Sequence, residues 1–282
     1  MRFLLLLILI NTILSKSLIS QIDYQQKEAE LILLIDSIRN VKTDEERFFL
    51  SDAIALELET ILTDASSMQY PFDSLKFISK IIAPDNTWRM FNWHIEDEKK
   101  QHRYWAIIQY KFQNNYRVIA LMDNSEDIKN PESKIFKAPQ WYGAHYYDVF
   151  KPEKNKYILL GYNGKLSNVS QKVIEVLYFD NKGNIVFGDD IFEAEKGNPK
   201  RIIFKYSKEV SMSLKYYDKN KTIVFDHLSP REPHLVNLYQ YYGPDLSYDA
   251  YTYKKGKWEL LKNIDVRKFV VENKKVKYNN PE

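Results

Sequence analysis

The chain is predicted to be an α+β protein, with two or three N-terminal helices followed by a mainly antiparallel β-meander that forms a sandwich or an open barrel. Three observations predict this fold. Apolar residues recur every three or four positions up to residue 84, and they alternate with polar residues from residue 88 onwards. The second half also contains several hairpin turns, and it lacks the long crossovers that parallel strands require. A small propeller fits the same hairpin spacing as an alternative, although no internal repeat supports it.

The segment over residues 21–84 is predicted to be helical. Its first helix, over 23–40, has an apolar stripe at Leu31, Leu34, Ile35 and Ile38. Thr43-Asp44-Glu45-Glu46 forms a capping box that starts a second helix, because the Thr and Glu side chains can bond backbone N–H groups of the first turn. A shorter apolar pattern over 72–82, which ends before Pro84, predicts a third helix.

The segment over residues 85–282 is predicted to be an antiparallel β domain, which can form one domain with the helices. Its clearest hairpin joins 173–179 to 185–187 through Asp180-Asn181-Lys182-Gly183-Asn184, where Gly and Asn can adopt the positive φ of a tight turn. Further hairpins join 211–217 to 222–225 and 248–253 to 257–261. Earlier strands are predicted over 88–95, 103–111, 116–122 and 157–161, and the polar stretch 124–139 is predicted to be an exposed loop.

Residues 1–20 are predicted to be a secretory signal peptide. Arg2 precedes an apolar run over 3–14, which is shorter than the roughly 20 residues that span a bilayer. Cleavage is expected among residues 17–21, leaving no stable membrane span, and the alternative is an uncleaved N-terminal anchor. Because the chain has no cysteine, it can carry neither a lipoprotein anchor nor disulfides. We expect an exported protein, periplasmic or secreted, from a Gram-negative bacterium.

The charge balance argues against nucleic acid as a partner. The chain has 41 Lys and Arg residues against 38 Asp and Glu residues, and residues 1–20 include Arg2 and Lys16, so the mature chain has a net charge of about +1. Aromatic residues make up 15% of the chain, and 21 of them are Tyr. Tyr suits both half-buried strand positions and binding surfaces, because its ring packs while its hydroxyl stays hydrated.

The first candidate catalytic cluster lies at the end of a predicted strand. Asp226 and His227 are adjacent there, and Glu232 and His234 follow in the next loop. Neighbouring residues of an extended strand point to opposite faces, so Asp226 and His227 are not expected to act together, whereas Glu232 and His234 could share a face. A metal or acid–base site fits this pattern, and so does a loop held by backbone hydrogen bonds, which is the preferred interpretation.

The second cluster follows a turn at Gly243-Pro244-Asp245. In an extended segment Asp245, Ser247 and Asp249 line one face, at the one-three-five spacing of a calcium-binding loop. The calcium pattern then fails, because Ala250 stands where that loop needs glycine. The residues that remain as metal candidates are Asp245, Asp249, Glu232 and His234. Neither a metal nor a cofactor is expected.

The candidate binding residues are aromatic. Trp141, Tyr142 and Tyr147 crowd around His145 near a loop. The others, close to the second acidic cluster, are Tyr242, Tyr248 and Tyr251. Exposed, such rings could stack on a sugar or grip a partner protein. Buried, they would form an aromatic core patch, which is the preferred interpretation for the group around His145.

Three stretches resemble exported proteins of unknown function from Bacteroidetes: residues 173–188, residues 226–230 (Asp-His-Leu-Ser-Pro) and residues 243–249 (Gly-Pro-Asp-Leu-Ser-Tyr-Asp). The resemblance covers roughly the last 130 residues. It implies export from a Gram-negative cell, and it brings no activity and no catalytic residues.

The sequence therefore favours an exported, non-catalytic binding or interaction module for an envelope protein or a glycan. No Gly-rich phosphate loop, G-x-S-x-G or H-E-x-x-H motif is present. The alternative is an exported hydrolase, with or without a metal, whose Asp/His cluster is drawn from Asp226, His227, Asp245, Asp249 and His145. A third interpretation is a purely structural component of the envelope.

Overall fold

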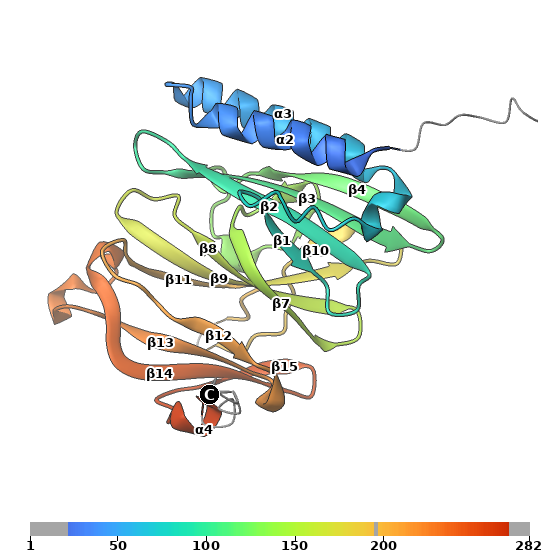
Figure 1. Ribbon diagram of the computed structural model, residues 1–282. Coiled ribbons are helices and arrows are strands. Elements are labelled where there is room, and N and C mark those ends of the chain that lie inside the picture. The colour runs from blue at the N-terminus through green and yellow to red at the C-terminus, as the bar shows by residue number, and fades with distance from the viewer. Residues whose placement is uncertain (1–21, 195–196, 271–282) are drawn as a thin grey trace, which may run out of the picture.

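The structure is a computed structural model that describes residues 22–194 and 197–270, so the predicted signal peptide lies outside the described residues. Within this part of the chain the strands form three sheets, here named A, B and C, and two helices cover the outer face of sheet A (Figure 1). Three apolar clusters fill the spaces between helices and sheet A, between sheets A and B, and between sheets B and C. The predicted α+β class with antiparallel strands is confirmed, and the sheets stack as layers without closing into a barrel.

The two helices are α2 (Tyr24–Ile38) and α3 (Asp44–Leu62). The capping box predicted at Thr43 is present, with the Thr43 hydroxyl accepting from the Glu46 backbone N–H and the Glu46 carboxylate accepting from the Thr43 N–H. Leu31 of α2 and Leu58 of α3 are fully buried and pack with Phe91 of sheet A. Helices and sheet A therefore share one core. A short 3₁₀ turn, η1 (Ala65–Gln69), leads from α3 towards the first strand.

Sheet A consists, in order, of β1 (Ser79–Ile82), β2 (Trp88–Glu96), β3 (His102–Phe112), β4 (Asn115–Asp123) and β6 (Gln140–Trp141). All neighbours are antiparallel except β4 and β6. The third helix predicted over 72–82 is wrong, because Phe72 adopts a positive φ of 53° and Ser79 pairs with Asn92 of β2. Leu75 and Ile78 are both buried and have the spacing of a helix, but the chain reaches these positions through consecutive turns.

Sheet B is the middle layer. Its strands, in order, are β5 (Phe136–Lys137), β10 (Ile185–Phe187), β9 (Val169–Phe179), β8 (Lys156–Asn163) and β7 (His145–Glu153), and β11 (Ile202–Ser207) also pairs with β9. The predicted β9–β10 hairpin is confirmed, with Gly183 at φ 78°. Val173 of β9 packs towards sheet A and Ile174 towards sheet C, which explains why this strand is apolar on both faces.

Sheet C consists of β12 (Leu214–Tyr217), β13 (Thr222–Pro230), β14 (Tyr242–Lys254) and β15 (Lys257–Leu261), and a short helix, α4 (Arg267–Val270), follows. Both predicted hairpins of this region are confirmed. The pairing of β13 with β14 continues to Pro230 and Tyr242, and this end of the pair (orange in Figure 1) reaches up beside sheet B. The residues between them form two 3₁₀ turns, η4 (Pro233–Leu235) and η5 (Tyr239–Tyr241).

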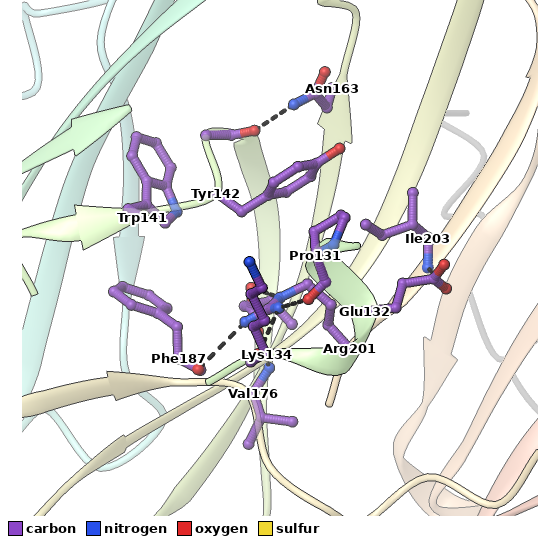
Figure 2. Close-up of polar contacts among 12 residues, drawn as sticks. Pro131, Glu132, Lys134, Trp141, Tyr142, Asn163, Val176, Phe187, Arg201 and Ile203 are labelled. Atoms are coloured by element: carbon purple, nitrogen blue, oxygen red, sulfur yellow. Dashed lines mark hydrogen bonds and ion pairs between the residues drawn. The ribbon is translucent and has the colours of Figure 1, made fainter. Parts of the chain in front are cut away.

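The stretch 124–139, predicted to be an exposed loop, is fastened to sheet B. It contains η2 (Pro131–Ser133) and the buried ring of Phe136. Arg201 lies beside it, fully buried, with its Nε donating to the Glu175 carboxylate at 2.7 Å. The other guanidinium nitrogens donate to the carbonyl oxygens of Pro131, Lys134 and Phe187 (Figure 2). Arg201 and Glu175 thus form a buried polar hub that anchors this loop to sheet B, although its polar composition alone predicts an exposed loop.

Candidate functional site

A groove of about 500 Å³ lies between sheets B and C. Tyr147, Asp148 and Lys172 of sheet B line one side, and residues 212–216, at β12 and just before it, line the other. Its volume is in the usual range for small-ligand sites, which is about 300–1,000 Å³. Aromatic, cationic, acidic and hydroxyl groups meet here, and this mixture makes it the candidate binding site.

Tyr147 reaches the groove because β7 bulges at this residue. Tyr146 pairs with Gly161 and Asp148 pairs with Leu160, which leaves Tyr147 as the extra residue between them. Tyr146 is fully buried on the sheet A side, whereas Tyr147 is 40% exposed. The Tyr147 hydroxyl donates to the Leu214 carbonyl at 3.2 Å, and burial raises the pKa of this hydroxyl. The ring therefore spans from sheet B to sheet C and keeps part of its surface free.

Lys172 lies next to Tyr147 in the groove. Its Nζ is 4.4 Å from the centroid of the Tyr147 ring and 5.8 Å from that of Tyr162. Burial lowers the pKa of this amine. Within the described residues no carboxylate forms an ion pair with it, and its amine lies over two aromatic rings instead.

The predicted Asp/His cluster forms in part. A shift of register between Asp226 and Leu228 turns His227 so that its Nδ1 lies 2.8 Å from the Asp249 carboxylate and its Nε2 lies 3.9 Å from Asp245. Asp226 points the other way, as expected, and accepts from the Ser213 backbone N–H at 2.7 Å at the edge of the groove. The remaining candidate, His145, belongs to a different cluster in sheet B.

The His227–Asp249 pair has the geometry of an oriented imidazole. Asp249 is nearly buried and its other oxygen accepts from the Asn263 backbone N–H at 2.8 Å, so it can hold the Nδ1–H tautomer of His227. That leaves Nε2 of a 40%-exposed ring able to accept a proton. Asp245 is bonded by the hydroxyl and the N–H of Ser247, and the Ser247 hydroxyl is the main cause that lowers its carboxyl pKa. The pair could therefore act as a base on the open surface of sheet C.

The metal candidates do not gather around a common point. Asp245 faces Ser247, and Asp249 faces His227 and Asn263, so the calcium-like spacing is used for local hydrogen bonds. The carboxylate of Glu232 lies 3.4 Å from the ring of His234, and both side chains are mostly exposed. In the described part of the chain, no group of three or more His, Asp or Glu side chains is arranged to hold a metal ion.

The other predicted binding aromatics are placed less favourably. Trp141, Tyr142 and Tyr251 are buried, with exposed fractions of 0%, 6% and 4%. The Tyr142 hydroxyl donates to Gln171, and the rings of Trp141 and Tyr142 project between strands rather than outwards (Figure 2). Trp141 and Tyr142 belong to the core between sheets A and B, in line with the preferred interpretation of that group, whereas Tyr251 belongs to the separate core between sheets B and C. Tyr242 and Tyr248 are half-buried on β14.

Three histidines meet in a cluster that the sequence did not reveal. The rings of His94 and His102 stack with centroids 4.5 Å apart, and His145 approaches His94 edge-on at 5.2 Å. Burial lowers the pKa of all three, that of His94 to about 3, and the neighbouring imidazoles add to the effect at His94 and His145. The β2–β3 hairpin places His94 and His102 diagonally across one ladder, which its register could have predicted. His145 belongs to sheet B and meets the other two only because sheets A and B pack together, and no local sequence pattern predicts that contact.

A second polar cavity, of about 440 Å³, lies beside His102. Its lining also carries Lys165, whose Nζ lies 3.2 Å from the Glu126 carboxylate and 3.0 Å from the Ser125 hydroxyl. Lys165 is thus already paired within the protein, and the other cation of this cavity, Arg103, is exposed to solvent, in contrast to the half-buried Lys172. We therefore give preference to the groove between sheets B and C.

Among the described residues, no helix has the length and apolar character needed to cross a bilayer. Comparison with known proteins finds no matching protein-family model, no matching curated protein and no matching solved structure.

Proposed function

We propose that the protein is a non-catalytic binding module that is exported from the cytoplasm and takes a glycan in the groove between sheets B and C. The observation that supports this proposal is the ring of Tyr147, which a β-bulge turns into a groove that also carries charged and hydroxyl groups. Aromatic faces bind the apolar side of a sugar, and polar groups at the edge bind its hydroxyls.

The groove offers these elements at one place. Tyr147 and Tyr216 supply rings from opposite sides, and Tyr216 is held flat against Phe150 with ring centroids 3.6 Å apart. Asp148 and the Ser213 hydroxyl can bond sugar hydroxyls. A fixed ring costs little conformational entropy on binding, so this arrangement suits recognition without chemistry.

The test compares two tyrosines of equal exposure. Tyr147 is 40% exposed in the groove, and Tyr241 is 39% exposed near the tip of the β13–β14 pair. Glycan-array screening followed by calorimetry should identify a ligand. We expect Tyr147→Ala to weaken its binding about tenfold or more, a loss of about 1.4 kcal/mol, while Tyr241→Ala leaves it unchanged. Circular dichroism checks that both variants fold.

The opposite result for the two variants would place the binding site elsewhere on the protein. If Tyr241→Ala abolishes binding and Tyr147→Ala does not, the contact surface is the end of the β13–β14 pair, which also exposes Val236, Leu238 and Leu246. A protein partner would then be the better proposal. If no glycan binds at all, the proposal is wrong.

A hydrolase remains the second candidate because of the 2.8 Å contact between His227 and Asp249. This candidate requires turnover of at least one ester, glycoside or phosphoester in a chromogenic panel. If His227 is a general base, His227→Ala should lower that rate by about 10²-fold or more. His234→Ala, at a mostly exposed histidine in the next loop, is the matched control and should leave the rate unchanged. Absence of turnover across the panel supports the binding module.

Export rests on residues 1–20. Expression of the full chain in a Gram-negative host should place the protein outside the cytoplasm, and the mature N-terminus, read by mass spectrometry, should begin at or just after residues 17–21. Leu7→Arg puts a charge into the apolar run and should retain the uncleaved chain in the cytoplasm. A native chain that stays uncleaved in the cytoplasm would contradict export.

A further inference from the structure

We infer that the groove selects an anionic ligand, and that Lys172 binds its acidic group. This inference rests on the proposed glycan-binding function and narrows its ligand class to acidic sugars, in which a carboxylate or a sulfate supplies the negative charge. It starts from the surroundings of one amine.

The neighbours of Lys172 leave its charge without an acidic partner. Across the sheet it pairs with Tyr162 of β8 and with Phe204 of β11, both aromatic. Its Nζ lies over the rings of Tyr147 and Tyr162, and no carboxylate in the described part of the chain forms an ion pair with it. The side chain is half-buried, so water solvates the amine incompletely.

Most other half-buried lysines of this protein are paired with an acid. The exceptions are Lys205, whose Nζ lies over the Tyr239 ring, and Lys208, which donates to the Lys100 carbonyl oxygen. Lys151 contacts the Asp85 carboxylate, Lys156 lies within 3.1 Å of Glu153 and 2.9 Å of Asp189, and Lys165 contacts Glu126. Lys172 therefore differs from most half-buried lysines of this protein, because it lines a groove and has no acidic partner among the described residues.

Among the residues that line the groove, cations outnumber acids, and Asp226 at its edge already accepts from the Ser213 N–H. Lys172 and Lys215 line the groove against one acid, Asp148, whose carboxyl pKa is raised by burial. An anion placed against Lys172 would form a charge-assisted hydrogen bond in a partly dehydrated site, where such bonds are strongest. The exposed part of the Tyr147 ring lies next to it, so one sugar could contact the ring while its acidic group reaches the amine.

The test compares three oligosaccharides of equal length by calorimetry: an oligogalacturonide, a neutral galactan oligosaccharide and a sulfated galactan oligosaccharide. We expect the best acidic ligand to bind at least tenfold tighter than the neutral one, and this preference to shrink as salt is raised. The relative affinities of the carboxylated and sulfated ligands show which anion fits. Lys172→Met should remove the acidic preference, so that the acidic and neutral ligands bind this variant within about twofold of each other.

The control is Lys205→Met. Lys205 is also half-buried, with its Nζ 5.3 Å from the Tyr239 ring, but it does not line the groove, so its loss should leave the preference intact. Should Lys172→Met fail to fold, the salt dependence of the native protein decides. Equal binding of acidic and neutral ligands would overturn the inference and leave the glycan-binding function standing. Absence of any glycan binding would overturn both.

Discussion

Charged side chains are paired with acids on one face of β9 and not on the other. On the face towards sheet A, Glu175 and Arg201 are both fully buried, and the guanidinium is surrounded by one carboxylate and three carbonyl oxygens. On the face towards sheet C, the amine of Lys172 is half-buried and contacts rings instead of acids. The charge of Arg201 is fully paired, because the protein supplies every hydrogen-bond partner. The charge of Lys172 has no acidic partner in the part of the chain that the structure describes, and it is available to a ligand. The degree of pairing thus distinguishes a structural charge from a candidate binding charge.

The strongest test of this contrast is Arg201→Met. It leaves Glu175 buried without a partner and releases the carbonyls of Pro131 and Lys134, so we expect unfolding free energy to fall by about 3–5 kcal/mol. Chemical denaturation measures this loss. The double variant Arg201→Met, Glu175→Leu should recover a large part of it, because no buried charge then remains unpaired. A loss below about 1 kcal/mol would mean that the hub is not structural.

The histidine cluster provides an intermediate case, because its three rings are partly or fully buried and, among the described side chains, only His102 has a carboxylate, that of Glu96, within 3.2 Å. Because burial lowers the pKa of His94, His102 and His145, the unfolded chain binds more protons than the folded one below about pH 6.5. Stability should be fully present above that pH and decline as pH falls, with His94 alone contributing a loss of about 1–2 kcal/mol between pH 6.5 and 5.

Denaturation curves at several pH values measure this decline. His94→Phe should flatten the pH dependence, since the pKa of His94 is lowered furthest of the three, to about 3. His234→Ala should leave it unchanged, because that side chain is 72% exposed. A stability that is constant from pH 7 to 5 would show that the cluster opens to water or is protonated when folded.

The smallest expected effect is that of Lys172→Met on stability. Removing a half-buried cation without an acidic partner should change the unfolding free energy by about 1 kcal/mol or less, in either direction. Denaturation of Lys172→Met beside Lys205→Met, with Arg201→Met as reference, measures it. A loss as large as that of Arg201→Met would make Lys172 a structural residue and remove the contrast between the two faces.

The fold was predictable where local chemistry determines it. The capping box at Thr43 and the turn around Gly183 specify their own elements, since the required hydrogen bonds and φ values depend on a few adjacent residues. The helix predicted over residues 72–82 is wrong because the buried residues there have helical spacing, whereas residues 79–82 pair as a strand with the edge of β2. Tertiary pairing there overrides the local pattern.

The site was predictable only in part. The sequence placed His227 in one cluster and Asp245 and Asp249 in another, and combined them only in the hydrolase alternative. These three side chains do come together, whereas Asp226 and His145 lie elsewhere. The groove depends instead on a bulge at Tyr147 and on sheet C packing over Lys172, and neither leaves a local signature. Likewise, Arg201 and Glu175 are 26 positions apart and meet through the pairing of β11 with β9.

The stacking of layers also has a consequence for truncation and for synthesis. Sheet B is covered on both faces, so a fragment that ends before β12 would expose the residues of β8 and β9 that face sheet C, among them Ile158, Leu160 and Ile174. Such a nascent or truncated chain would expose a broad apolar surface that is prone to aggregation. It should depend on chaperones until the described residues from β12 onwards, 214–270, have emerged.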